Sequence, residues 1–323
     1  MFSDLPKLLD RNFAVGYFLP AAIFLAATDH LLQAFGRLPY SSVKALTAEH
    51  PWLGAAVMVV ATWVLALLLL GANRSVVRLK EGYGLDFAWN PLKLVEKWRF
   101  QCLERELADL LAKREAKLKA GEELPATLRA ELIRKGHQRA LRYPDEERFL
   151  LPTAFGNTIR AFEVYPRVMY GVESTEIWSR LLAVVPKEYR ELVDLAKSQV
   201  DFWVNSWAVL VLLVVEYGAL QVVWGGWQAA WLPAVAVAGI PFTSYWSRKL
   251  AEEWGGRVKT CFDVFLPELR KKLELGVPAS RAAERELWGD VSKGFLYRLP
   301  AGLPERAPAA PAKPGSSGAG ATP

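Results

Sequence analysis

The sequence predicts an all-α integral membrane protein with four transmembrane helices and a helical cytoplasmic domain that contains a coiled-coil-like hairpin. The first reason is composition. The chain of 323 residues is 52% hydrophobic and holds 13 tryptophans, and its mean hydropathy is +0.11. The second reason is that uncharged apolar stretches, long enough to cross about 30 Å of hydrocarbon, alternate with charged stretches. The third is that leucines in the charged stretches recur at helical spacing.

The first transmembrane hairpin is expected in residues 1–72, with spans at about 13–32 and 52–72. The second of these spans, "WLGAAVMVVATWVLALLLLGA", contains no charged residue and has the roughly 20 residues that a helical span needs. The first, "FAVGYFLPAAIFLAATDHLL", is a weaker candidate because its unbroken apolar run stops at Ala27.

A cleaved signal peptide is the alternative interpretation of the first span. Lys7 and Arg11 would supply the positively charged segment that precedes the apolar run of such a peptide. A cut after Ala27, however, would put Leu25 at a position where small residues are preferred. We therefore expect an uncleaved first helix.

The second transmembrane hairpin is expected in residues 203–246, with spans 203–224 and 227–246 joined by two uncharged glycines. Basic residues follow the second and fourth spans: Arg74, Arg78 and Lys80, then Arg248 and Lys249. Positive charge accumulates on the cytoplasmic side of membrane proteins, so both termini and the long middle segment should be cytoplasmic. We expect these five residues to contact anionic lipid headgroups.

Residues 73–202 are expected to form the cytoplasmic helical domain, which begins with one of two structures. Val76, Leu79 and Tyr83 lie at helical spacing, which predicts a short interfacial helix; a frayed helix end with ordinary flanking cations is the alternative. A coiled-coil-like helical hairpin with a turn between Gly121 and Pro125 follows. Its apolar repeats are Phe100, Leu103, Leu107 and Leu110, then Leu124, Leu128 and Leu132.

The rest of this domain is predicted from its caps and prolines. Thr153 can cap a helix, which Pro166 should end. One face of that helix is polar and carries Asn157, Arg160 and Glu163. Pro186 should open the next helix, and no breaker follows before the third span. We therefore expect a continuous stalk that runs from Lys187 into the membrane.

The C-terminal part divides into cytoplasmic helices at 247–299 and a tail at 300–323. The glycine pair at 255–256 and Pro267 are expected to interrupt the helices. The tail is rich in Pro, Ala and Gly, which cannot form a core, so it should be disordered.

The chain shows no motif of a known catalytic, metal or cofactor site. It has three histidines, at positions 30, 50 and 137, and the predicted topology puts the third on the opposite side of the membrane from the others. No Cys-x-x-Cys, His-Glu-x-x-His, Gly-x-Ser-x-Gly or phosphate-binding glycine loop occurs. The net charge of +6 has no nucleic-acid-binding motif beside it. We expect no metal, no cofactor, no nucleic acid, and free thiols at Cys102 and Cys261.

Three polar residues are candidates for a role inside the membrane: Glu216, His30 and Asn205. An ionised carboxylate in hydrocarbon must pair, take up a proton or face water. We expect Glu216 to face the bundle and accept a hydrogen bond, with His30 as its ionisable partner. The alternative is a carboxyl that turns to the outer headgroups or is satisfied by Tyr217, Gln221 or water.

The stretch "LPTAFGNTIRAFEVYPRVMYGVESTEIWSRL" from Leu151, with "VDFWVNSW" from Val200, resembles a family of uncharacterised bacterial four-span inner-membrane proteins. The resemblance implies a location in the bacterial cytoplasmic membrane. It implies no activity and no site residues.

These observations favour a non-enzymatic bacterial inner-membrane protein whose cytoplasmic helical domain binds a protein partner or signals to the transmembrane bundle. The first alternative is an oligomeric channel, pore or transporter, built from copies of the chain, with Glu216 in the membrane path. The second is a membrane enzyme with a cytoplasmic pocket near Asn157 and Arg160.

Overall fold

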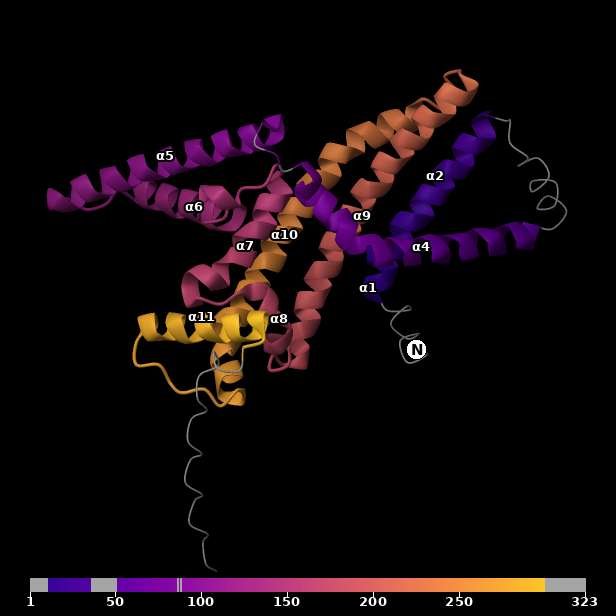
Figure 1. Cartoon of the computed structure of the whole chain (residues 1–323). Helices are drawn as coiled ribbons and strands as arrows, with labels where there is room; N and C mark the ends of the chain where they lie inside the picture. Colours follow the sequence, from indigo (N-terminus) through magenta and orange to yellow (C-terminus); the bar gives the residue numbers. More distant parts are fainter. Residues whose placement is uncertain (1–10, 36–50, 86, 88, 300–323) are drawn as a thin grey trace, which may run out of the picture.

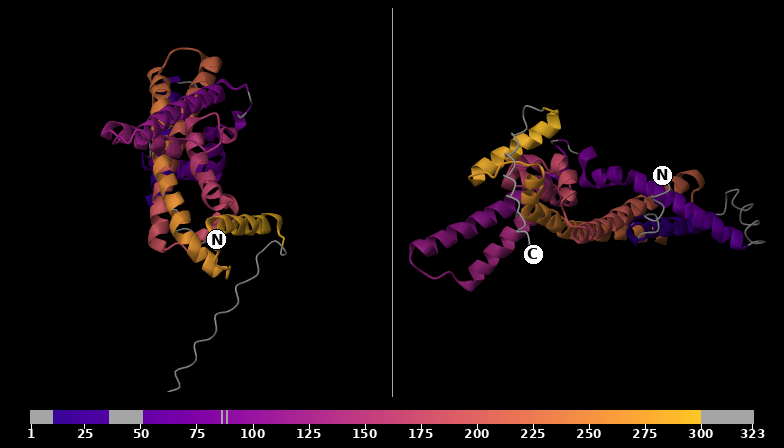
Figure 2. Two further views of the ribbon diagram at one scale, coloured as in Figure 1. Left: turned by 90° about the vertical axis from the view of Figure 1, so that its left-hand side faces the viewer. Right: turned by 90° about the horizontal axis from the view of Figure 1, so that it is seen from below.

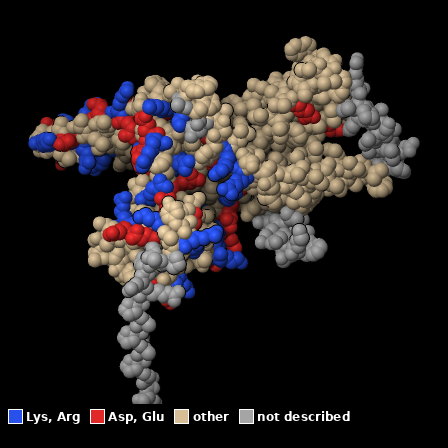
Figure 3. Space-filling view, in the orientation of Figure 1, with Lys and Arg blue, Asp and Glu red and all other residues tan. Residues whose placement is uncertain are grey.

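The computed structural model describes residues 11–35, 51–85, 87 and 89–299, and its regular elements there are helices, with no strand among them. Two regions can be distinguished (Figure 1). We call residues 11–35, 51–72 and 203–246 the apolar bundle, and residues 73–202 and 247–299 the helical body. Charged side chains gather over the helical body, whereas the face of the bundle seen in Figure 3 is almost free of them.

Three described helices are long and apolar enough to cross a membrane: Ala14–Phe35, Trp52–Glu81 and Lys187–Trp224. They comprise the π-helical η2 (Ala14–Phe18) with α2 (Leu19–Phe35), then α4 (Pro51–Glu81), and α9 (Lys187–Trp224). The short α1 (Arg11–Phe13) precedes η2. The all-α class and the apolar membrane-length helices are thereby confirmed.

The expected fourth span belongs to α10 (Trp231–Lys272), which is not among these three helices. Residues 227–230 form the turn after α9, so the apolar part of α10 begins at Trp231 rather than at Trp227. From there to Trp246 it is about 24 Å long at 1.5 Å per residue, short of the roughly 30 Å of hydrocarbon. This part of α10 packs along α9 (Figures 1 and 2).

The long helices run without a break from the bundle into the helical body. The continuous stalk expected from Lys187 is confirmed by α9, which ends at Trp224 before Gly225. The expectation that the glycine pair at 255–256 and Pro267 interrupt the later helices is wrong, because α10 continues through both. Gly255 lies so close under Phe162 that an added Cβ would come within 2.4 Å of that ring. Tertiary packing therefore overrides helix propensity here.

The end of α4 differs from the expected interfacial helix, because α4 continues to Glu81 without interruption. Thr153 joins this end to the start of α7 (Ala154–Tyr170). Its Oγ1 accepts from the Gly156 N–H at 2.9 Å, as the predicted cap, and donates to the carbonyl oxygens of Lys80 and Glu81. The Thr153 hydroxyl thus hydrogen-bonds to backbone groups at the ends of two helices, and such terminal groups have no partner within their own helix. α7 passes through Pro166, which was expected to end it.

α5 (Pro91–Lys119) and α6 (Ala126–Arg142) lie side by side and project from the rest of the molecule (Figures 1 and 2). We call this pair the arm. Its inner apolar residues include Phe100, Leu103 and Leu110, which are buried. Coiled-coil geometry for the arm stays a prediction.

The core of the helical body is a cluster contributed by α7, α8 (Ser174–Leu182), α9, α10 and α11 (Arg281–Tyr297). Phe162, Phe262 and Trp288 are among its largest buried side chains. Among the described residues, neither this cluster nor the hydrophobic residues packed against it include any residue of the arm. The proposed domain boundaries after residues 72, 202 and 246 fall inside α4, α9 and α10. The tail at 300–323 lies outside the described residues.

Candidate functional site

Glu216 accepts a hydrogen bond inside the bundle, but its partner is Thr28. The Thr28 Oγ1 donates to Glu216 Oε2 at 2.8 Å, which joins α2 to α9. His30 instead lies edge-on to Trp231, with ring centroids 5.6 Å apart. Tyr217 accepts from Gln221 rather than meeting the carboxylate. The structure therefore separates Glu216 from the expected ionisable partner and gives it a neutral hydroxyl.

Asn205 is fully buried and compensates for a proline in the facing helix. Pro20 has no N–H, so the carbonyl of Gly16, four residues earlier, lacks its usual helical donor. The Asn205 Nδ2 donates to that carbonyl at 2.9 Å. The backbone around Gly16 is π-helical, as is common where a helix accommodates an irregular hydrogen bond. Asn205 thereby joins α9 to the first span.

The three polar-face candidates of α7 are divided between two sites. Asn157 is fully buried and donates from Nδ2 to Glu96 Oε2 at 3.2 Å and to the Leu151 carbonyl. Its Oδ1 accepts from the Leu151 N–H at 2.7 Å. Arg160 instead donates to the Tyr83 hydroxyl and pairs with Glu163 at 3.3 Å. The expected single pocket near Asn157 and Arg160 is thus two separate environments.

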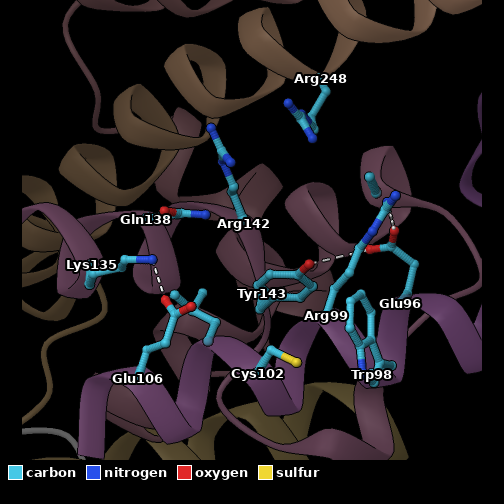
Figure 4. Close-up of a pocket in the computed structure, with 12 residues that line it drawn as sticks. Glu96, Trp98, Arg99, Cys102, Glu106, Lys135, Gln138, Arg142, Tyr143 and Arg248 are labelled. Atoms are coloured by element: carbon cyan, nitrogen blue, oxygen red, sulfur yellow. Dashed lines mark hydrogen bonds and ion pairs between the residues drawn. The ribbon is translucent and has the colours of Figure 1, made fainter. Parts of the chain in front are cut away.

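Glu96, the partner of Asn157, lines a cavity of about 390 Å³ at the root of the arm, which we call the root cavity; Asn157 itself does not line it. The root cavity lies between α5, α6 and α10 (Figure 4). Its charged lining consists of Arg99, Lys135, Arg142 and Arg248 with Glu96 and Glu106. Figure 4 shows Trp98, Arg99 and Cys102 along α5, with Arg142 and Arg248 across the cavity. These cations already have carboxylate neighbours: Glu96 for Arg99, Glu106 for Lys135, and Glu252 for Arg142 and Arg248.

Glu96 connects the root cavity to α7. It is buried and accepts from Arg99 Nη1 at 2.8 Å, from Asn157 Nδ2 and from the Tyr143 hydroxyl at 3.5 Å. Burial, with the nearby Glu96 charge, raises the pKa of Tyr143 to about 12, so the phenol stays neutral at physiological pH. The network therefore holds one carboxylate with several donors and leaves no free base.

Glu252 anchors the root of the arm to α10. Its carboxylate pairs with Arg142 Nε at 3.0 Å and Lys249 Nζ at 3.4 Å. Arg248 Nε lies 4.0 Å from the same carboxylate, is buried and makes no hydrogen bond to the described residues. Arg248 and Lys249, which were expected to contact lipid headgroups, thus contribute to this joint.

The second environment is a cavity of about 390 Å³ between the end of α4 and helices α7 to α10, which we call the junction cavity. Arg74 and Arg78 line it and are exposed. Lys80 does not line it and is buried; its Nζ lies 4.4 Å from the centre of the Trp207 ring. Lys80 is therefore buried in the protein, whereas the sequence predicted that it contacts lipid headgroups. Burial raises the pKa of Glu163, and the nearby arginines partly offset this rise.

Asp201 is the main residue of the junction cavity that sequence reasoning missed. It is buried and accepts from the Tyr17 hydroxyl at 2.9 Å, Asn73 Nδ2 at 3.2 Å and Lys197 Nζ at 2.7 Å. Three helices are joined by this one carboxylate. The available signal was a carboxylate two residues before the expected start of the third span. Glu96 likewise lies one helical step before the apolar repeat that starts at Phe100.

These arrangements suit binding and positioning rather than covalent chemistry. No histidine lines either cavity, and Cys102 is the one thiol in the lining of the root cavity. Burial raises the pKa of the Cys261 thiol, which lies in the core, to about 11. Within the described ranges, no group of three His, Cys, Asp or Glu could hold a metal ion.

No family model, curated protein or solved structure matches this chain.

Proposed function

We propose that this chain is a non-enzymatic bacterial inner-membrane protein with four spans, whose arm binds a cytoplasmic protein partner and whose long helices carry the resulting change into the bundle. Both termini and the helical body are cytoplasmic in this proposal. α10 supplies the fourth span, and Arg74 and Arg78, with the cations around Arg248, mark the inner side.

The observation that carries the proposal is a difference in packing. The long helices are joined to the helical body by apolar contacts, whereas the arm is joined to it mainly by polar ones. α9 and α10 are held together with α7 and α11 by a continuous apolar core. The arm is fastened at its root mainly by polar contacts, such as the ion pair of Arg142 with Glu252 and the bond from Lys259 Nζ to the Ala140 carbonyl. Partly exposed ion pairs exchange with water at low net cost, whereas the buried bond from Asn157 to Glu96 holds the start of α5 on α7. The arm can therefore move about that point while the core stays intact.

The long helices supply the route from the arm to the membrane. Glu252 lies on α10, six residues beyond the aromatic residue Trp246 that closes the apolar stretch. A force applied at the root of the arm therefore acts on a helix that is continuous with the bundle. α9 packs along α10, so we propose that the two helices move together.

Site-specific photocrosslinking in cells tests the partner. A photoreactive residue at Leu118 or Ile133 lies on the exposed surface of the arm, at 54% and 66% exposure. Val264 and Val277, at 54% and 82% exposure, are matched control positions outside the arm. We expect a discrete adduct from the arm positions that is absent at the controls. Equal labelling of all four positions would contradict a binding arm.

The coupling has a separate readout. Pairs of spin labels across α2 and α4 report the arrangement of the bundle in the purified protein. The partner identified by crosslinking is then added in purified form. We expect it to shift the distribution of distances between the spin labels in the parent protein but not in a variant that lacks residues 92–142. A shift that persists without the arm would show that the partner acts elsewhere.

A further inference from the structure

The junction cavity lies where both of its long helices change from uncharged to charged sequence. α4 carries no charged residue before Arg74, and α9 carries none between Asp201 and Glu216. The lining includes Asn73 and Arg74 at the boundary on α4 and Asp201 at the boundary on α9. If α4 and α9 cross a membrane, the cavity therefore opens at the level of the lipid headgroups.

The charges in the cavity wall are incompletely paired within the protein. Asp201 is satisfied by Lys197, Tyr17 and Asn73. In contrast, no hydrogen bond or ion pair to another described residue involves the side chains of Arg74, Arg78 or Glu81. Arg78 makes one contact, over the Tyr83 ring at 5.2 Å from its centre.

Glu81 is the most buried carboxyl group without a hydrogen-bond partner among the described residues that line this cavity. The residue is only 6% exposed, and its position is fixed because an added Cβ on Gly156 would come within 2.3 Å of the Glu81 carbonyl oxygen. Glu163, whose side chain is 41% exposed, lines the same cavity. Burial raises the pKa of Glu81 to about 7, and the charges of Arg160 and Arg78 partly offset this rise. A cation bound beside Glu81 would favour its ionised form and so stabilise this end of the cavity.

The wall thus offers two guanidinium groups and two carboxylates to one ligand. Arg74 and Arg78 lie one helical turn apart, on one face of α4, and guanidinium suits a phosphate. Between the charges the wall is apolar, with Val77, Phe155, Ile159, Val200 and Trp254. A ligand that fits has a phosphate, an ammonium group and an apolar part.

We propose that the junction cavity binds the headgroup of a zwitterionic phospholipid with a primary amine, of the phosphoethanolamine type. The phosphate lies at Arg74 and Arg78, and the ammonium group donates hydrogen bonds to Glu81 and Glu163. An anionic headgroup without an amine would leave Glu81 without a hydrogen-bond donor and Glu163 with Arg160 as its ion-pair partner. The inference depends on α4 and α9 crossing the membrane, as in the proposed function, but not on a partner for the arm.

Native mass spectrometry of the full chain in detergent tests the site. The probes are phosphatidylethanolamine and phosphatidylglycerol with identical acyl chains. We expect one copy of phosphatidylethanolamine to bind more tightly than phosphatidylglycerol. Glu163→Gln and Arg78→Gln each remove one charge-assisted hydrogen bond and should weaken that binding about tenfold. Glu115→Gln and Arg114→Gln, exposed on the arm, are matched controls and should leave it unchanged.

The experiment distinguishes binding of a lipid from binding of a soluble headgroup, and it distinguishes failure of this site from failure of the proposed arm. Equal binding of the two lipids, or unchanged binding in both cavity variants, would overturn the proposal. Soluble glycerophosphoethanolamine is the competitor, and displacement of the lipid at equal concentration would overturn the assignment to a lipid. Glu163→Gln preserves side-chain shape, and circular dichroism verifies that each variant is folded. Lipid binding in a variant without residues 92–142 is expected to persist, whatever the fate of the proposed partner.

Discussion

At the residue scale, the bundle shows how one side chain can replace a missing backbone donor. Asn205 donates to the Gly16 carbonyl that Pro20 leaves without its helical partner. The importance of Asn205 should therefore depend on whether residue 20 is proline. An asparagine in an apolar helix is explained here by the chemistry of the helix that it faces.

This dependence can be measured with a double-mutant cycle. Asn205→Ala alone should destabilise the protein by about 1 kcal/mol, the order expected for a hydrogen bond between membrane helices. In a Pro20→Ala background, position 20 regains an N–H that can serve the Gly16 carbonyl, so Asn205→Ala should have a smaller effect. Denaturant unfolding in mixed micelles gives the four free energies. Additive effects would mean that Asn205 acts independently of Pro20.

Glu163 should make stability depend on pH. Because burial raises its folded-state pKa above the ordinary 4.5, the folded protein binds this proton more tightly than the unfolded chain does. The resulting stabilisation is complete below about pH 4.5 and is lost as the pH rises through the raised pKa. Glu163→Gln stays neutral, so its stability relative to the parent should improve as the pH rises from about 4.5 through the raised pKa.

The measurement is the difference in melting temperature between Glu163→Gln and the parent, taken without added lipid at several pH values. Glu131→Gln, exposed on the arm, controls for the substitution itself. A difference that stays constant with pH would refute the assignment of this titration to Glu163.

At the element scale, the arm and the long helices should respond differently to loss of one carboxylate. Glu252→Ala removes the partner of Arg142 and Lys249. Hydrogen exchange near the end of α6 should then accelerate about tenfold, which corresponds to one charge-assisted hydrogen bond. Protection in α9 and in the core part of α10 should stay unchanged. Glu253→Ala, one residue further and exposed, is the control.

A uniform increase of exchange through α9 and α10 would contradict this prediction, because it would mean that Glu252 stabilises the core rather than the joint. The difference matters for function. A joint that opens locally leaves the helical body able to transmit motion, whereas a core that loosens does not.

How far the elements could be predicted follows from the range of the forces that decide them. The cap at Thr153 and the continuity of α9 depend on neighbouring residues and were predictable. The glycines at 255–256 fail as breakers because a residue distant in sequence, Phe162 of α7, packs against α10 at Gly255. The same holds for the site. Asp201 accepts from Tyr17, 184 residues away, and no local pattern encodes that approach.

At the scale of the whole molecule, the proposed topology makes a direct prediction for labelling in intact cells. A cysteine replacing Ala126, at the start of α6, should be protected from a membrane-impermeant thiol reagent. A cysteine replacing Ser41, which lies outside the described residues, should react. The two native thiols are first replaced, and permeabilised cells give the maximum labelling for each position. The reverse pattern would invert the topology.

The core of the helical body also constrains how the molecule is made. Its buried cluster combines residues that precede the second half of the bundle, such as Phe155 and Ile159, with residues that follow it, such as Phe262 and Trp288. During synthesis the first group emerges well before its packing partners. This region therefore cannot complete its fold until residues 203–246 have been synthesised and α11 has left the ribosome. Exposed apolar surface persists throughout that interval. In the proposed topology, efficient insertion of the last two apolar segments is therefore a condition for escape from aggregation and proteolysis.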